Sequence, residues 1–273
     1  MTQKARNETK WWGAKGRETN RPSILNLVKS STLDVEMAAV LWLLMERKGS
    51  VVVASEAPQV GKTTFLSALL DLMPPWYNAV YVYGKDADLG PLKENKPGSS
   101  YILAPELGPD SAAHVWGKSV VSIFKAMDKG FSLGTTFRAD SPEEVFTTLQ
   151  GKPASVPQKL LGNVHAIVNL RLVQGVRSVN RRVCQLTLTS HAEKGDGWRL
   201  VTLTGWEPDS DSHIHMKSSE TRSALAARME MDGDELEEDL TARQRRLRAW
   251  LDIGLTGTED LRKAITKHYR SRE

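Results

Sequence analysis

Short apolar runs alternate with helical patterns through the first half of the chain, and this alternation restricts the fold most. The runs occupy residues 51–53, 79–83, 101–104 and 131–137. Apolar residues repeat at helical spacing before the first run, from about Asp34 to Gly49, and after the third, from Asp110 or Ser111 to about Lys129. Such β and α segments in turn predict a mostly parallel sheet with helices on both faces.

The pattern changes after residue 160. Three β-like runs at 164–173, 181–190 and 198–206 are joined by short polar turns, which predicts an antiparallel extension of the sheet. From Met216 the chain reads as helical and charged. We therefore expect a basic, disordered tail at 1–22, a core with its β extension at 23–215, and a helical C-terminal region at 216–273.

The charge of the chain is concentrated in its first 22 residues. Six basic and two acidic residues there give an excess equal to the net charge of +4 of all 273 residues. The rest is therefore near neutral, which argues against nucleic acid as a partner. No apolar run approaches the roughly 20 residues that span a bilayer. A secretory signal is not expected, and the single Cys184 fits a cytoplasmic protein.

The stretch EAPQVGKT at 56–63 resembles a phosphate-binding P-loop, which reads G-x-x-x-x-G-K-[ST]. Gly61 permits close approach of a phosphate, Lys62 reaches the β- and γ-phosphates, and the Thr63 hydroxyl ligates Mg²⁺. A buried strand before the loop and a helix after it supply the expected context. Without that context, Gly-Lys would be an ordinary turn that starts a helix.

The loop departs from the full motif in ways that should weaken nucleotide binding. Glu56 replaces the first glycine and brings a negative charge near the phosphates unless it points to solvent. Gln59 stands where another glycine is common, and Pro58 has no N–H to donate.

Three segments in sequence resemble the secretion ATPase superfamily of type II and type IV secretion and pilus-assembly motors. Residues 31–70 resemble its lead-in helix, strand, P-loop and following helix. YILAPELG at 101–108 resembles a Walker B strand that ends in a glutamate, and AMDKGFSLGTTFRADSPEEV at 126–145 resembles the histidine-box region. The resemblance implies an α/β fold with a RecA-like P-loop NTPase core, to which the β extension and helical C-terminus are added.

The resemblance also implies a set of site residues. Glu106 corresponds to the Walker B glutamate, which orients water and, with Thr63, holds Mg²⁺. Arg138 occupies the histidine position of the histidine box and could sense the γ-phosphate, while Phe131 replaces another histidine of that region. Alternatively, Glu106 is a capping or surface acid and Arg138 a surface arginine. The residues expected around ATP are Pro58, Gln59, Val60, Gly61, Lys62, Thr63 and Thr64.

Several parts of the family pattern are missing. Asp86 and Asp88 lie near the acidic box but out of register, and the stretch before Walker B lacks the usual arginines. The resemblance implies an ATP-binding, ATP-hydrolysing motor subunit that forms a homo-oligomeric ring. Its partners would be inner-membrane secretion or pilus components, and its location cytoplasmic or peripheral at the inner face of the membrane. A non-hydrolysing scaffold of the same fold and a DNA-handling P-loop protein remain alternatives.

Two minor features have their own interpretations. His213 and His215 alternate in an extended stretch and, with Asp209 or Asp211, could hold a metal. Arg177, Arg181 and Arg182 cluster at a predicted hairpin, where they either form a solvated turn or meet a neighbouring subunit or nucleic acid.

Overall fold

The computed structural model describes residues 21–174, 179–191 and 197–271. The described strands form one sheet in the order β2-β3-β4-β1-β5-β6-β7-β8. The pairs from β2 to β5 are parallel and the pairs from β5 to β8 are antiparallel. The strands are β1 (Val51–Ala54), β2 (Asn78–Tyr81), β3 (Ser100–Leu103), β4 (Ser132–Phe137), β5 (Ala166–Gln174), β6 (Val179–His191), β7 (Trp198–Glu207) and β8 (Ser212–His215). The predicted α/β fold, with a mostly parallel sheet and an antiparallel extension, is confirmed.

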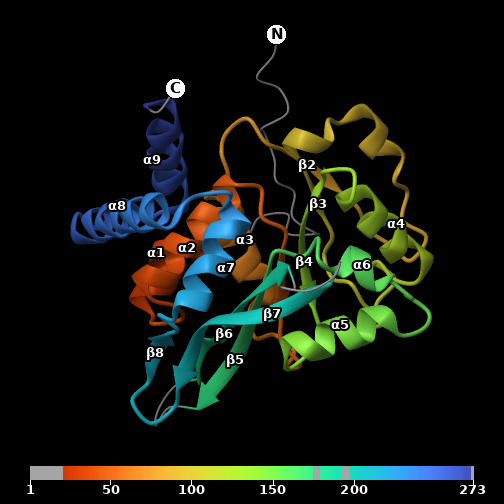
Figure 1. Cartoon of the computed structure of the whole chain (residues 1–273), viewed down its shortest axis with the longest axis horizontal. Helices are drawn as coiled ribbons and strands as arrows, with labels where there is room; N and C mark the ends of the chain where they lie inside the picture. The colour runs from red at the N-terminus through yellow and green to blue at the C-terminus, as the bar shows by residue number, and fades with distance from the viewer. Residues whose placement is uncertain (1–20, 175–178, 192–196, 272–273) are drawn as a thin grey trace.

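Helices cover both faces of the sheet (Figure 1). The described α-helices are α1 (Ile24–Lys29), α2 (Val35–Glu46), α3 (Lys62–Leu70), α4 (Lys118–Met127), α5 (Pro142–Gln150), α6 (Gln158–Leu161), α7 (Ser219–Met229), α8 (Gly233–Asp252) and α9 (Thr258–Arg270). Short 3₁₀ turns, η3 (Gly90–Glu94) and η4 (Pro97–Ser99), lie between β2 and β3. The short helix α6 was not predicted.

The strand β1 divides the hydrophobic core in two because successive side chains of a strand point to opposite faces. Val51 and Val53 join the cluster made with α1–α3 and α7–α9. Val52 and Ala54 join the other cluster, made with α4–α6. All four residues of β1 are buried, as expected for a central strand covered on both sides.

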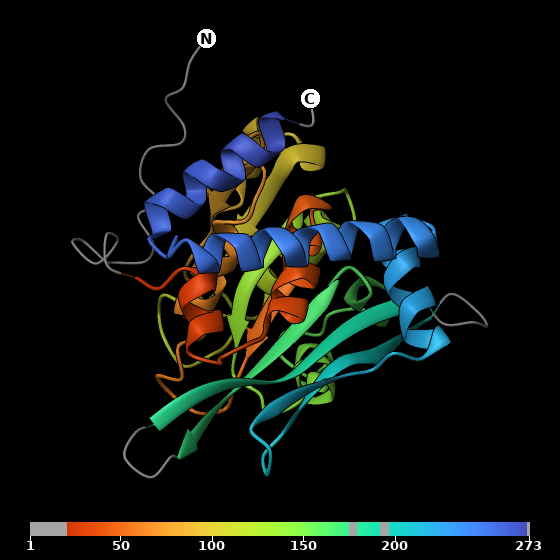
Figure 2. The same cartoon turned by 90° about the vertical axis from the view of Figure 1, so that its left-hand side faces the viewer.

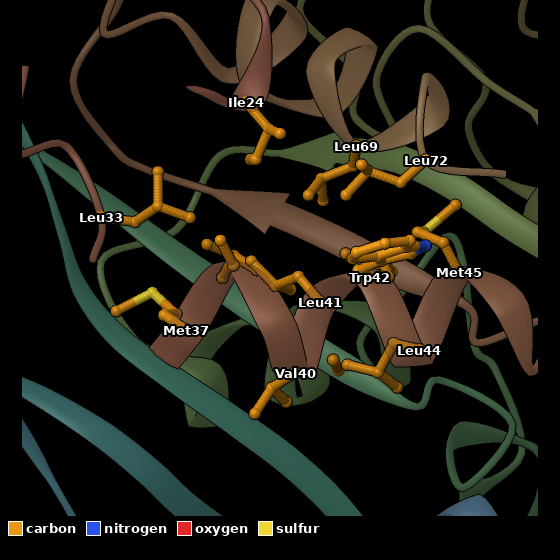
Figure 3. Packing of buried hydrophobic residues seen from close by; sticks show 14 of the residues in the cluster. Ile24, Leu33, Met37, Val40, Leu41, Trp42, Leu44, Met45, Leu69 and Leu72 are labelled. Carbon is orange, nitrogen blue, oxygen red and sulfur yellow. The ribbon is translucent and has the colours of Figure 1, made fainter. Parts of the chain in front are cut away.

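Helix α2 is apolar around its whole circumference. Every residue from Met37 to Met45 is buried, because α8, α3 and α1 pack against α2 and its side chains share one cluster with Val51 and Val53 of β1. Figure 2 shows α8 lying across α1 and α2. In Figure 3, Trp42 points toward Leu69 and Leu72 of the α3 segment, and its indole N–H donates to the Tyr269 hydroxyl of α9 at 2.9 Å. The C-terminal helices therefore share one core with α2.

Local signals explain where the helices begin. Asp34 caps α2 by accepting from the Met37 N–H at 2.8 Å, and Ser141 caps α5, whose first residue is Pro142. Residues 1–20 of the expected tail lie outside the described residues. Arg21, placed in that tail by the sequence, donates to the buried Asp71 at 2.6 Å.

The helix predicted from Asp110 or Ser111 begins only at Lys118, so the prediction for residues 110–117 was wrong. Gly117 has φ of 64° and ψ of −133°, values that lie outside the α-helical region, so the helix cannot include this residue. Val115 instead forms a β-bridge with Leu107, and its N–H donates to the Glu106 carbonyl at 3.0 Å. This bridge fixes the segment that follows β3, where the candidate site lies.

Among the described helices, none combines the length and apolar character that a membrane span requires.

Candidate functional site

The loop between β1 and α3 has the backbone of an anion-binding turn. Gln59 and Gly61 have positive φ values of 57° and 99°, and Gly61 stands at the N-cap of α3 without a side-chain cap. The first N–H groups of a helix have no intrahelical partner and lie at the positive end of its dipole. The nine-residue helix α3 therefore presents main-chain donors toward the loop.

Lys62 folds back over this loop. Its Nζ donates to the Ser55 carbonyl at 3.1 Å and lies 3.2 Å from Glu106 Oε2. Only 12% of the Lys62 side chain and 15% of the Glu106 side chain are exposed, so the pair is shielded from bulk water. Lys62 thus closes the loop and joins it to the segment after β3.

Glu106 is held from several directions. The Thr136 hydroxyl of β4 lies 3.0 Å from Glu106 Oε2 and 2.7 Å from the Pro105 carbonyl, and it donates its single proton to one of them at a time. His114 Nδ1, buried and without a hydrogen-bond partner, lies 3.8 Å from Glu106 Oε1. The carboxylate is therefore oriented beside Lys62, with an imidazole on its other oxygen.

Glu56 does not fill the loop. Its Oε1 accepts from Arg138 Nε at 2.9 Å, and Arg138 Nη1 lies 3.5 Å from Asp110 Oδ2. The Glu56 carboxylate, helped by Asp110, raises the pKa of Arg138 above its usual value. Both Glu56 and Arg138 are about half exposed. The acidic residue of the loop and the arginine that follows β4 are thus paired with each other.

Arg181 of β6 supports the opposite flank of the loop. Its Nε donates to the Val60 carbonyl at 2.9 Å, and a Cβ at Gly61 would lie 3.4 Å from the same nitrogen. The adjacent Arg182 is buried and pairs with Asp211, which lowers the pKa of that carboxyl to about 2. Both arginines lie within strand β6 rather than in a turn; Arg182 is buried and Arg181 is exposed, and Arg177 lies outside the described residues.

The structure brings some of the predicted site residues together and not others. Lys62 and Glu106 meet directly, whereas Arg138 is held by Glu56. Pro58, Gln59 and Thr63 are exposed on the loop, Val60 is buried beneath it, and Gly61 and Thr64 are partly exposed.

Four residues near the site were not predicted: Asp110, His114, Thr136 and Arg181. Of these four, only Thr136 has a sequence feature that could have indicated its place in the site: it lies in the Thr-rich strand next to the Walker B-like strand.

Oxygen donors for Mg²⁺ are present in the form that this ion prefers. Thr63 offers an exposed hydroxyl at the start of α3, and Glu106 offers a carboxylate. Mg²⁺ is commonly held by one or two protein oxygens together with substrate phosphates and water. The residues present therefore fit Mg²⁺ bound with a nucleotide. In the described ranges, no group of three or more His, Cys, Asp or Glu could hold a metal by itself.

The histidines of β8 have other neighbours. His215 Nε2 lies 2.6 Å from Asp34 Oδ2, and Asp211 is engaged by Arg182 and by the Trp206 indole. These contacts link β8 to the N-terminus of α2.

Comparisons with known proteins give distant similarities. No family model matches the chain. The uncharacterized protein MJ1287 of Methanocaldococcus jannaschii is 28% identical over 206 residues, which cover 68% of this chain and 76% of that protein. The uncharacterized protein MJ0900 of the same organism is 25% identical over 214 residues, which cover 70% of this chain and 38% of that protein.

Two solved structures of ATPases also show similarity. The VirB11 ATPase from the Brucella suis type IV secretion system, solved with sulphate, has 17% identity and a TM-score of 0.41 over 69% of this chain and 64% of that one. The Legionella pneumophila ATPase DotB has 11% identity and a TM-score of 0.40 over 88% and 65%. The chain thus spans slightly less than two thirds of each. Similarity at this level does not bear on activity.

Proposed function

We propose that the chain binds ATP with Mg²⁺ at the loop of residues 56–63 and hydrolyses it. The observation that carries the proposal is the position of the Lys62 ammonium, held over the loop by the Ser55 carbonyl and beside Glu106. A second observation supports it: Glu56, the residue most at odds with phosphate binding, is turned toward Arg138.

Each group then has a role that follows from its chemistry. The free N–H groups at the start of α3 bind phosphate oxygens, and Lys62 neutralises their charge. Thr63 and Glu106 would hold Mg²⁺, which supplies charge neutralisation at the reacting phosphate. Glu106, oriented by Thr136, accepts a hydrogen bond from the attacking water and fixes its direction.

The wider role is part of the same proposal. The chain would be a subunit of a ring-forming secretion or pilus motor at the inner face of the membrane. This part of the proposal depends on the three sequence segments that resemble that superfamily. In such a ring, an arginine of a neighbouring subunit would complete the site. Sedimentation or light scattering of the full chain, with and without ATP and Mg²⁺, tests the assembly. A monomer under both conditions would contradict it.

One observation favours a non-hydrolysing scaffold as the second candidate. Arg138, which the resemblance implies as the γ-phosphate sensor, is held by Glu56 and Asp110. A chain in which this pairing persists would bind nucleotide without the charge stabilisation that turnover needs.

Binding and turnover, measured together, separate the two candidates. ATP binding by calorimetry and phosphate release are compared for wild type, Lys62→Ala and Glu106→Gln. The exposed Lys159→Ala and Glu143→Gln serve as matched controls. We expect Lys62→Ala to weaken binding by at least about tenfold, since a charge-assisted contact is worth roughly 1.5–3 kcal/mol. Glu106→Gln should bind ATP but release no phosphate.

Two outcomes would count against the proposal. If Lys62→Ala binds ATP as tightly as the wild type does, the loop is not the nucleotide site. If the wild type binds ATP but releases phosphate no faster than Glu106→Gln does, the non-hydrolysing scaffold is favoured.

A further inference from the structure

Helix α8 carries opposite charges on its two halves. Its first half reads GDELEEDL at 233–240, and its second half contains RQRRLR at 243–248. Leu236, Arg243 and Leu247 are buried on the side of α8 that packs on the core. Figure 2 shows α8 running across the front of the molecule, with α1 and α2 behind it. The other side of α8 therefore faces outward.

The outward side of α8 carries an outer stripe, which consists of Glu238, Ala242, Arg245 and Ala249, all of them exposed. Residues seven apart lie within about 20° of each other around a helix axis. Ala242 and Ala249 therefore share the middle of the stripe, and Glu238 and Arg245 share one edge. Among the described residues, neither Glu238 nor Arg245 pairs with a charged group. Both charges are thus available to a partner.

Two cavities meet at Ala242, which lines both of them. The acidic cavity, of about 250 Å³, lies toward the start of α8, and its acidic residues are Glu46, Glu235, Glu238 and Asp239. Arg47 and Arg243 also line it, but Arg243 is paired with Glu46 and Asp239. The basic cavity, of about 650 Å³, lies between α8 and α9, and its basic residues are Arg245, Arg246 and Lys267, with His268 beside them. The surface thus changes sign at Ala242.

A second α8, turned end for end about Ala242, matches this pattern. In an antiparallel pair with a twofold axis at Ala242, each acidic half lies over the basic half of the other copy. Glu238 and Arg245 stand four and three residues from the axis along the same edge, so each faces the other residue in the second copy. Met231, in the acidic cavity, and Ile253, which is 73% exposed, lie equally far from Ala242 in sequence, so these apolar side chains also meet.

We propose that the outer stripe of α8 binds a second copy of this chain, with the two α8 helices antiparallel and Ala242 at the twofold axis. Charge complementarity selects this partner. An unrelated acidic molecule would match only the basic cavity, whereas a second copy matches both halves of the helix. The same surface is used by both copies, so the contact closes with two chains, whereas a ring requires different surfaces to meet. The contact is therefore separate from the proposed ring and needs no nucleotide.

Charge reversal tests the pairing. Sedimentation velocity of the full chain without nucleotide compares wild type with Glu238→Arg, Arg245→Glu and the double variant that carries both. Glu237→Arg and Arg248→Glu are matched controls, because both residues are exposed on α8 and lie away from the outer stripe. Each reversal on the stripe should raise the dimer dissociation constant at least about tenfold at low salt, since the twofold axis places like charges together twice. The double variant should return to within about threefold of wild type, and the controls should stay there.

A cross-link tests the orientation. Cys184→Ser removes the chain's own thiol, and Ala242→Cys or Ala249→Cys is then added. In the antiparallel pair the two residues 242 face each other, whereas the two residues 249 lie about 21 Å apart along the helices, too far for a disulfide. Mild oxidation should therefore give a covalent dimer with Ala242→Cys and not with Ala249→Cys.

Three results would overturn the proposal. The first is a wild type that stays monomeric without nucleotide, as expected if the basic cavity receives an acidic molecule of another kind. The second is a double variant that associates no better than either single reversal. The third is a cross-link at residue 249 as efficient as that at residue 242, which would mean that the helices are not antiparallel about Ala242.

Discussion

Replacement of Arg243 by methionine tests how the C-terminal helices are held to the core. Arg243 of α8 is 2% exposed, and its Nη2 donates to Glu46 Oε2 of α2 at 2.5 Å. It also pairs with Asp239 and stands over the Trp42 ring, 4.8 Å from the centroid. Burial alone lowers the pKa of Arg243, but Asp239 and Glu46 outweigh it and raise the pKa above the usual value. The guanidinium therefore remains charged in the core.

The expected loss of stability follows from the two carboxylates that Arg243→Met leaves without the guanidinium. Glu46 and Asp239 are 21% and 13% exposed, so two poorly hydrated carboxylates lose their contact with the guanidinium. Breaking a buried pair on one side costs about 3–5 kcal/mol, and the partial exposure of both acids favours the lower end. We expect a loss of about 3 kcal/mol, or roughly 6–12 °C in melting temperature for a chain of this size.

Urea unfolding at low and high salt is the assay. Arg248→Met is the control, because Arg248 is exposed on the same helix and has one weak contact, to Gln244 at 3.4 Å. The effect of Arg243→Met should persist at high salt, since buried pairs are little screened. A loss below about 1 kcal/mol, as for an exposed pair, would refute the buried-pair reasoning.

Three further predictions concern pH, charge and a second buried pair. Burial and the nearby Arg228 lower the pKa of His165 from 6.5 to about 3, so the folded protein binds this proton less readily than the unfolded chain. The free energy of unfolding should therefore fall as pH falls below 6.5, by roughly 2 kcal/mol between pH 7 and 5. Urea titrations of wild type and His165→Gln measure this contribution as the difference between the two proteins, and equal pH dependence of both would contradict it. Glu56→Gln should tighten ATP binding by less than about tenfold at low salt and less at high salt, because both members of its pair with Arg138 are exposed; weaker binding in calorimetry would contradict it. Asp71→Asn should lower the free energy of unfolding by about 3 kcal/mol, since the fully buried Asp71 carboxylate pairs with two arginines; denaturant melts within about 1 kcal/mol of wild type would overturn it.

The parallel half of the fold could be predicted because its signals are local. Each buried run is bounded by turns or helix caps, and parallel strands place their carboxyl ends at one edge of the sheet. Lys62 follows one such end and Glu106 another, so a sequence that predicts both strands also predicts their proximity. The two side chains lie 3.2 Å apart.

Other features of the site depend on long-range packing and were not predictable. Val115 and Trp116 fit a helical spacing, yet Gly117 and the bridge from Leu107 to Val115 determine the backbone there. His114 reaches Glu106 only because of that bridge. Arg181 contacts the loop through a hairpin that lies 121 residues away in the chain, a distance at which sequence patterns carry no register.

The pairing of Glu56 with Arg138 has an evolutionary consequence. Glu56 brings a negative charge to the loop, and Arg138, an arginine 82 residues later, pairs with it. Either residue without the other leaves an unpaired charge at the loop, so the two positions should change together. Relatives with glycine at the first position should therefore carry a neutral or titratable side chain at the second, and an alignment with the two varying independently would show that the contact is incidental.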